Sequence, residues 1–279
     1  GAHLITGGLG SLGLIAAHEL AELGAPSLIL ASRSGRVTPG SNLDAELDRL
    51  QAYPRTKVLL QRLDVSSEEE VAKLASEAAS RGAPLRGVLH AAGVLDKCSL
   101  ADLSPERLTN GLKPKAHGAW YLHKNTQAED IGMFVLFSSV SATVGLANGA
   151  SYSAGSAYLD ALARWRWEQY GGLSVKFGPV AGSSMTDVSA SRLGDAPLKT
   201  LPSTYAASAL RLVLAKQGPQ APPSAEVTLA RADWGLFMRE IGVTIPQLSD
   251  FKPEGAASAE VQDADATLAR MPAEERQRM

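Results

Sequence analysis

Residues 3–13 have the sequence HLITGGLGSLG, in which a short apolar run leads directly into closely spaced glycines. The apolar run predicts a strand, and the residues after it, to about Leu23, have the pattern of a helix. Gly8, Gly10 and Gly13 satisfy G-x-G-x-x-G at this junction. Glycines there let the backbone turn tightly and approach a pyrophosphate, which then lies at the helix N-terminus. A purely structural glycine turn is the alternative, but the position between strand and helix favours dinucleotide binding.

Short apolar strands alternate with amphipathic helices over most of the chain. Strands are predicted at 3–6, 27–31, 57–60, 86–90, 133–137 and 173–177, and helices at 12–23, 42–52, 67–81, within 103–127 and at 152–170. This alternation is typical of a parallel sheet with helices on both faces. The sequence therefore predicts an α/β fold with a Rossmann-like, doubly wound parallel sheet flanked by helices.

The pattern loosens after Gly178. Residues 182–200 are rich in Ser, Gly and Asp. We expect Met185 and the residues after it to form a small lid beside the site, and an ordinary surface loop is the alternative. A helix over 203–217 and a short strand at 226–229 are predicted next.

Composition excludes several classes of protein. The 279 residues carry a formal net charge of −2, so there is no basic excess for nucleic acid. No apolar run approaches the roughly 20 residues of a transmembrane helix, and no membrane span or metal site is predicted. The single cysteine, Cys98, excludes an internal disulfide and favours a reducing, cytoplasmic compartment. We interpret Cys98 as a small, half-buried residue, with a reactive thiol as the alternative.

The end of the second predicted strand favours NADPH as the dinucleotide. Its last residues are followed by Arg33, where an NAD site would tend to have an acidic residue. A guanidinium pairs well with the 2′-phosphate and stacks on adenine, whereas the alternative is a surface arginine in a loop. Asp64 follows the third strand and has two possible roles, accepting from the adenine amino group or capping the next helix.

A hydroxyl and a phenol are expected to converge near the fifth strand. This strand ends at Ser138 and Ser139, and Tyr152 opens the next helix. The residue four positions later lies on the same helix face and in many such sites is a lysine that tunes the phenol. Here that residue is Ser156.

Seven short motifs together carry a family resemblance. They are TGGLGSLG, SRSG, LDVSS, VLHAAGVLD, LKPKAHGAWYLH, VLFSS and YSAGSAYLDALA, within residues 1 to about 240. With these motifs the chain resembles the short-chain dehydrogenase/reductase superfamily, and more narrowly the ketoreductase domain of modular type I polyketide synthases. In that branch the lysine comes from an earlier Pro-Lys motif, which Pro114 and Lys115 match, and an asparagine stands at the Ser156 position.

The resemblance implies a reduction in which Tyr152 donates a proton to a ketone oxygen and Ser139 hydrogen-bonds to that oxygen. Lys115 would stabilise the phenolate and hold the nicotinamide ribose. Each residue has an alternative: Ser138 as the source of the hydroxyl in place of Ser139, Tyr152 as a core residue, and Lys115 as a solvated helix lysine. Because serine is shorter than asparagine but still binds water, we expect Ser156 to lower the rate without abolishing it.

The site residues expected from the pattern and the resemblance fall into two groups. The cofactor-binding group is Thr6, Gly8, Gly10, Ser11, Leu12, Gly13, Ser32, Arg33, Asp64, Val65, Ala91, Ala92, Gly93 and Pro179, and the catalytic group is Tyr152, Ser139, Lys115 and Ser156. The family's stereochemical markers are absent, since Lys97 and Val144 occupy their positions, so the configuration of the alcohol stays open.

The resemblance implies NADPH-dependent reduction of a β-ketoacyl thioester on acyl carrier protein, with other domains of the same synthase as further partners. Two alternatives are the ketoreductase domain of a multifunctional fatty acid synthase and a reductively silent or epimerising domain. We expect a catalytic domain over 1–250 and, over 251–279, a linker towards a carrier protein. Because the family's structural subdomain does not precede the first strand, we also expect a fragment of a larger polypeptide.

Overall fold

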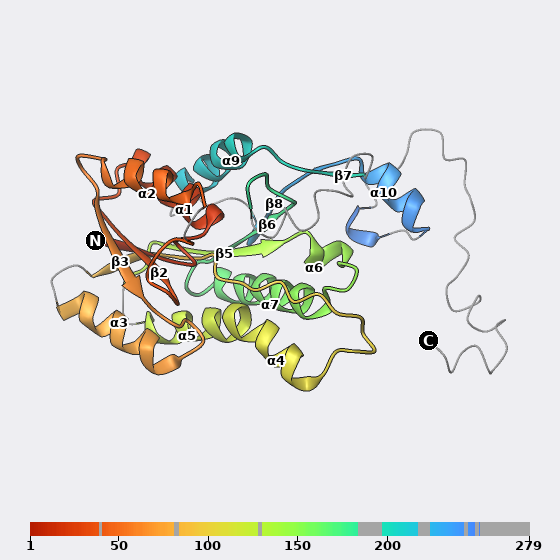
Figure 1. Cartoon of the computed structure of the whole chain (residues 1–279), viewed down its shortest axis with the longest axis horizontal. Helices are drawn as coiled ribbons and strands as arrows, with labels where there is room; N and C mark the ends of the chain where they lie inside the picture. Colours follow the sequence, from red (N-terminus) through yellow and green to blue (C-terminus); the bar gives the residue numbers. More distant parts are fainter. Residues whose placement is uncertain are drawn as a thin grey trace. The chain divides into compact units, whose positions relative to one another are not determined.

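Seven parallel strands form one sheet in the order β3-β2-β1-β4-β5-β6-β8 (Figure 1). They are β1 (Ala2–Thr6), β2 (Ser27–Ser32), β3 (Lys57–Arg62), β4 (Leu85–His90), β5 (Met133–Ser139), β6 (Leu173–Phe177) and β8 (Glu226–Leu229). The computed structural model describes residues 1–38, 41–80, 84–127, 130–183, 197–216, 224–242, 245–248 and 251. The order reverses between β1 and β4, and ligands of such sheets bind outside the carboxyl ends of the strands at this reversal.

Helices cover both faces of the sheet (Figure 1). One face carries α1 (Ser11–Glu22), α2 (Leu43–Gln51) and α9 (Ser203–Ala215), and the other carries α3 (Glu68–Ser80), α4 (Pro105–Leu112), α5 (Gly118–Asn125) and α7 (Ala150–Trp167). The predicted doubly wound α/β fold is therefore confirmed. The short helix α6 (Ser141–Val144), which the sequence did not predict, follows β5 directly.

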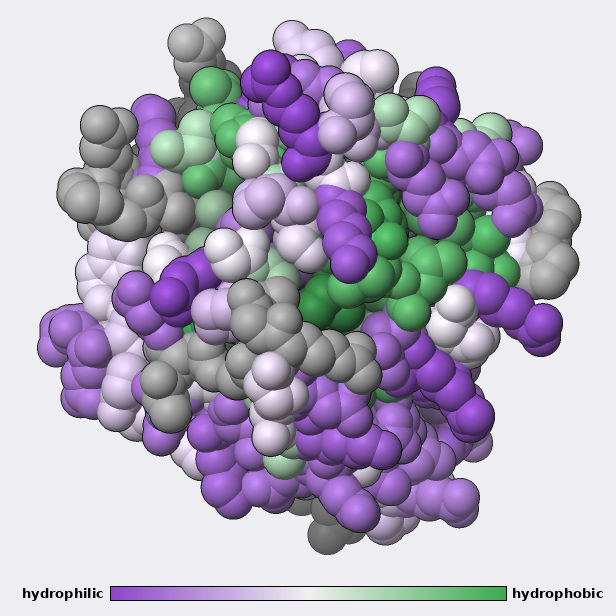
Figure 2. All heavy atoms as spheres, turned by 90° about the vertical axis from the view of Figure 1, so that its left-hand side faces the viewer, coloured by the Kyte–Doolittle hydropathy of each residue, from purple (hydrophilic) through white to green (hydrophobic). Residues whose placement is uncertain are grey.

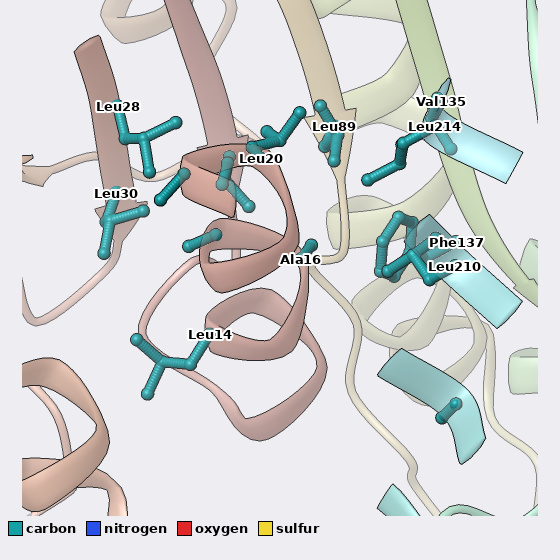
Figure 3. Close-up of a cluster of buried hydrophobic side chains, with 14 of the residues drawn as sticks. Leu14, Ala16, Leu20, Leu28, Leu30, Leu89, Val135, Phe137, Leu210 and Leu214 are labelled. Atoms are coloured by element: carbon teal, nitrogen blue, oxygen red, sulfur yellow. The ribbon is translucent and has the colours of Figure 1, made fainter. Parts of the chain in front are cut away.

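Each face of the sheet has its own hydrophobic core. In the core below α1 and α9, Leu14 and Leu20 of α1 and Leu210 of α9 belong to one buried cluster with side chains of β2 and β5 (Figure 3). These three side chains are almost completely buried. Burying a leucine side chain contributes about 1.5–3 kcal/mol, so this layer fixes α1, and the glycine turn before it, on the sheet. The inner strands β1, β2, β4 and β5 are buried on both faces over most of their length, as expected for a sheet covered on both sides.

The segment predicted to be helical within 103–127 is divided into three parts. Between α4 and α5 lies one π-helical turn, Lys113–His117. Pro114 has no N–H, so it cannot donate the i→i−4 bond of a regular α-helix. Gly118 N instead donates to Lys113 O, five residues back, and to Lys115 O. The turn thus has a local cause in the sequence, although the periodicity alone did not show it.

The strand β3 lies at one edge of the sheet and leaves Leu59 and Leu60 partly exposed. Figure 2, seen from the side of Figure 1 on which β3 lies, shows hydrophobic residues gathered among hydrophilic ones.

A two-residue antiparallel pair, β7 (Leu198–Lys199) with β9 (Arg231–Ala232), was also not predicted. Met185 and most of the predicted lid lie outside the described residues.

The chain divides into two compact units, Gly1–Ala232 and Asp233–Met279. The second contains α10 (Trp234–Ile241), whose first turn is capped by the Asp233 carboxylate accepting from Leu236 N. The predicted linker over 251–279 lies outside the described residues, apart from Phe251. Among the helices that the structure describes, none is long and apolar enough to cross a membrane.

Candidate active site

A cleft of about 190 Å³ opens at the carboxyl ends of β4, β5 and β6. Its lining includes three of the four residues expected to be catalytic, Lys115, Ser139 and Tyr152, together with the predicted cofactor residues Leu12, Ala91, Gly93 and Pro179. The rest of the lining is mostly apolar, with Leu95, Val144, Leu146, Val180 and Leu198 among its members. The polar groups are therefore few, as in many small-molecule sites. The part of the cleft where Lys115, Ser139 and Tyr152 lie close together is called its polar end.

The glycine turn between β1 and α1 fits a pyrophosphate. Gly7 has a φ of +69°, and a Cβ on Gly13 would collide with the carbonyl oxygen of Gly7. Gly10 is the N-cap of α1, no side chain caps this terminus, and the first turn has no acidic residue. The first N–H groups of α1 are thus free of a side-chain acceptor, which is the arrangement that binds phosphate at helix N-termini.

The end of β2 forms a tight turn held by Ser32, whose Oγ accepts a hydrogen bond of 3.1 Å from Gly35 N. Arg33 is exposed in this turn. Arg62, which the sequence analysis did not single out, pairs in register with Ser32, and a Cβ on Gly35 would lie 3.4 Å from its Cβ. Among the described residues, neither arginine forms an ion pair. The register of β2 and β3 would have revealed Arg62, but register is not visible in one sequence.

Asp64 is engaged in local structure at the end of β3. Its Oδ1 accepts a hydrogen bond of 2.9 Å from Ser66 N, and its own N–H donates to Glu70 Oε2 over 2.8 Å. These bonds form a turn before α3, but the cap of α3 is Ser67, whose Oγ accepts from Glu70 N, so Asp64 does not itself cap the helix. Val65, the next predicted cofactor residue, is buried beside Gly118.

Ser139 and Tyr152 are brought together across the cleft. Ser139 ends β5, and its Oγ accepts from Ser141 N over 3.1 Å. Tyr152 lies in the first turn of α7. Burial raises the pKa of the Tyr152 phenol, and a hydrogen bond with Ser139 opposes the rise. Ser138 instead donates its hydroxyl to the Ser156 carbonyl over 3.1 Å, so it fastens β5 to α7.

Lys115 is a buried cation beside Tyr152. Its Nζ donates to Phe137 O over 3.0 Å and lies 4.8 Å from the centroid of the Tyr152 ring. Only 3% of Lys115 is exposed, so the alternative of a solvated helix lysine is wrong. Burial lowers the pKa of its ammonium to about 8, and the negative charge of Asp160 opposes the shift. The lysine stem passes between Gly93 and Gly155, where a Cβ would come within 3.1 and 3.3 Å of it.

Ser156 occupies the interior side of α7, one turn after Tyr152. It is completely buried, and its hydroxyl has no hydrogen-bond partner among the described protein groups. A buried hydroxyl without a partner costs about 1–3 kcal/mol. The residue therefore lies one helical turn from Tyr152, but its hydroxyl is not hydrogen-bonded to Tyr152 or Lys115.

Beyond the predicted residues, the structure adds His90 at the end of β4. The ring is completely buried, with Nδ1 2.7 Å from Thr6 Oγ1 and Nε2 3.1 Å from Lys115 O. Burial and the nearby Lys115 charge lower the pKa of this histidine to about 4. The motif VLHAAG contained the residue, but only the fold shows what its two nitrogens contact.

The profile of the family described as "KR domain" matches residues 1–182. The chain belongs to this ketoreductase domain family of modular type I polyketide synthases. It is 37% identical over 169 residues to the phthioceranic/hydroxyphthioceranic acid synthase of Mycobacterium bovis, with 61% of this chain and 8% of that protein covered. It is 33% identical over 278 residues to the polyketide synthase GfsA of Streptomyces halstedii, covering 97% of this chain and 4% of that protein.

Solved structures give the same assignment. The ketoreductase from the first module of phoslactomycin biosynthesis in Streptomyces sp. HK803 superimposes with a TM-score of 0.79 at 32% identity, over 92% of this chain and 58% of that one. The chain spans only 8% and 4% of the lengths of the two curated synthases named above. Ketoreductases of this family use nicotinamide cofactors, in agreement with the glycine turn described above.

Proposed function

We propose that this ketoreductase domain uses NADPH to reduce a β-ketoacyl thioester to the β-hydroxyacyl thioester. The observation that carries the proposal is the buried ammonium of Lys115, 4.8 Å from the Tyr152 ring at the polar end of the cleft. This lysine comes from outside α7, as in the polyketide ketoreductases that the chain resembles. Its position compensates for the missing lysine at residue 156.

The cofactor residues divide according to the parts of the dinucleotide. The glycine turn and the uncapped N-terminus of α1 would hold the pyrophosphate, and Ala91, Gly93 and Pro179 line the cleft where the nicotinamide would lie. Arg33, joined by Arg62, would bind the 2′-phosphate, since two guanidiniums without an ion-pair partner in the described part of the chain suit that anion. When bound, NADPH supplies the hydride for the ketone carbon.

Tyr152, Ser139 and Lys115 together would control the transfer of the proton to the substrate. As negative charge develops on the ketone oxygen, the phenol of Tyr152 donates its proton there, and Ser139 donates a second hydrogen bond. Burial alone would leave the phenol a weak acid, because its pKa is raised. The protonated Lys115 stabilises the phenolate that forms, which makes proton donation easier near neutral pH.

The cleft and the family support an acyl thioester as the substrate class. Leu95, Val144, Leu146 and Leu198 provide apolar surface for an acyl chain next to the polar end. We infer that the chain arrives on the phosphopantetheine arm of an acyl carrier protein, because tethering lets a weak docking contact suffice. The matched relatives are large polyketide synthases, which favours this pathway over a fatty acid synthase.

Oxidation of NADPH in the presence of a soluble β-ketoacyl thioester tests the proposal. We expect turnover by the wild type and a loss of at least about 100-fold in Tyr152→Phe, because the substitution removes only the proton donor. The affinity for NADPH, followed by its fluorescence, should be nearly unchanged in this variant. Tight NADPH binding without oxidation by the wild type would contradict a reductase.

That outcome would favour the second candidate, a silent or epimerising domain. The observation behind it is Ser156, whose buried hydroxyl has no hydrogen-bond partner among the described residues, at a position where the family has an asparagine. On the proposed function, Ser156→Asn should raise kcat several-fold, and Ser156→Ala should not. Because asparagine is larger and the position is completely buried, melting temperatures must accompany the rates. An unchanged kcat in a folded Ser156→Asn variant would show that serine does not impair the site.

A further inference from the structure

His90 connects the two halves of the site. It is the last residue of β4, and its ring lies between Thr6, where β1 enters the glycine turn, and Lys115 in the π turn. The distances are 2.7 Å from Nδ1 to Thr6 Oγ1 and 3.1 Å from Nε2 to Lys115 O. No other described side chain is hydrogen-bonded to both segments.

The chemistry of the partners determines which ring nitrogen carries the proton. A backbone carbonyl can only accept, so Nε2 carries the hydrogen and donates it to Lys115 O. Nδ1 is then free to accept from the Thr6 hydroxyl. Because the ring is completely buried next to a cation, it stays neutral and keeps this tautomer.

The π turn leaves little freedom around this ring. A Cβ on Gly118, at the end of the turn, would lie 3.1 Å from His90 Cε1 and 3.0 Å from Val65. The turn therefore packs directly on the imidazole, and the Lys115 carbonyl bonded to it is part of the residue whose ammonium faces Tyr152. A shift of this carbonyl would move the lysine stem, which passes between two glycines.

We propose that His90 is a positioning residue that sets the π turn, and with it the Lys115 ammonium, at a fixed place relative to the glycine turn. The inference rests on the proposed function for its kinetic consequence. The donor at Nε2 acts on proton transfer through Lys115, and the acceptor at Nδ1 acts on cofactor binding through Thr6. The two hydrogen bonds should therefore affect different measured quantities.

Two substitutions of His90, made in the full chain, distinguish the roles of its two ring nitrogens. The oxygen of His90→Asn replaces Nδ1 and keeps the acceptor for Thr6, whereas the amide nitrogen of His90→Gln replaces Nε2 and keeps the donor to Lys115 O. We expect His90→Asn to lower kcat by about 10- to 100-fold, the range that a displacement of about 1 Å produces. His90→Gln should recover most of that loss.

For the affinity for NADPH, the two variants should rank in the opposite order. We expect His90→Gln to weaken NADPH binding by about 3- to 10-fold, the effect of losing one hydrogen bond, and His90→Asn to weaken it less. Thr6→Val removes the same bond from its other end in a nearly isosteric way, so it should match His90→Gln in the dissociation constant. This arm needs no turnover.

A second buried histidine provides the matched control. His123 on α5 is 1% exposed, also has a pKa lowered to about 4, and contacts Arg166 and Gln127 away from the cleft. His123→Gln should lower the melting temperature without separating kcat from NADPH affinity.

Equal effects of His90→Asn and His90→Gln on both quantities would overturn the proposal and leave His90 as core packing. If the wild type binds NADPH without reducing the thioester, the proposed function fails, and the binding arm with Thr6→Val still decides the role of His90. Agreement of Thr6→Val with His90→Gln, and not with His90→Asn, would then support it. Three indistinguishable dissociation constants would contradict it.

Discussion

Lys115 is the residue whose charge the proposed reaction depends on most directly. Burial lowers the pKa of its ammonium to about 8, with Asp160 acting in the opposite direction. The neighbouring groups titrate elsewhere, since the pKa of His90 is about 4 and that of Tyr152 is raised above its ordinary value of 10.0. Of these three groups, only Lys115 changes its charge near neutral pH.

This separation predicts opposite pH trends for activity and stability. In the free protein, kcat/KM should fall by about tenfold per pH unit above about pH 8, as the ammonium loses its proton. Between about 8 and 10.5 the unfolded state keeps a proton that the folded state has released, so this residue makes the free energy of unfolding rise with pH. Rate profiles and urea denaturation from about pH 6 to about pH 10 measure both.

The control for this prediction is Lys115→Met, which keeps most of the apolar stem. It should have low activity and should lack the rise in stability above about pH 8. A wild-type kcat/KM that stays constant to about pH 9.5 would show that the ammonium is not needed, or that its pKa in the folded protein is not lowered.

At the scale of elements, the carboxyl ends of neighbouring strands assemble the cofactor site. The turn after β2 presents Arg33, and the end of β3 presents Arg62 next to that turn. Either strand considered alone provides one exposed arginine, which is weak evidence for a phosphate-binding site. Pairing of the strands gives two cations without acidic partners among the described residues.

The proposed 2′-phosphate site predicts selective effects on NADPH. We expect Arg33→Ala and Arg62→Ala each to raise the KM for NADPH by about tenfold, because each removes one charge-assisted hydrogen bond. The KM for NADH should change little. Arg55→Ala is the matched control, since Arg55 is also exposed but precedes β3, at the opposite end of that strand. Equal losses for NADH and NADPH would contradict a phosphate contact.

The helices and strands also show how much of the fold could be predicted from the sequence. Apolar periodicity and glycine spacing predicted the strands from β1 to β6 and β8, because those signals are local. The division of 103–127 by a π turn was missed, although Pro114 is its local cause. The burial of Lys115 and the contacts of His90 depend on how segments 22 or more residues apart pack, which one sequence does not contain.

At the scale of the whole molecule, the family assignment rests on agreement between independent signals. The motifs, the strand order and the solved ketoreductases all give the same fold. The division of the chain at residue 250 and the carrier protein as partner remain predictions. They concern segments that the structure does not describe, or proteins outside the chain.

The origin of the catalytic lysine has a consequence for how activity is lost. Tyr152 is carried by α7, but Lys115 is carried by the π turn between α4 and α5. Local opening that moves the 105–125 segment away from α7 would therefore separate the pair while α7 stays helical. The activity should therefore depend on the packing of the 105–125 segment against α7. Under mild denaturation it should disappear before the circular dichroism signal of the helices changes.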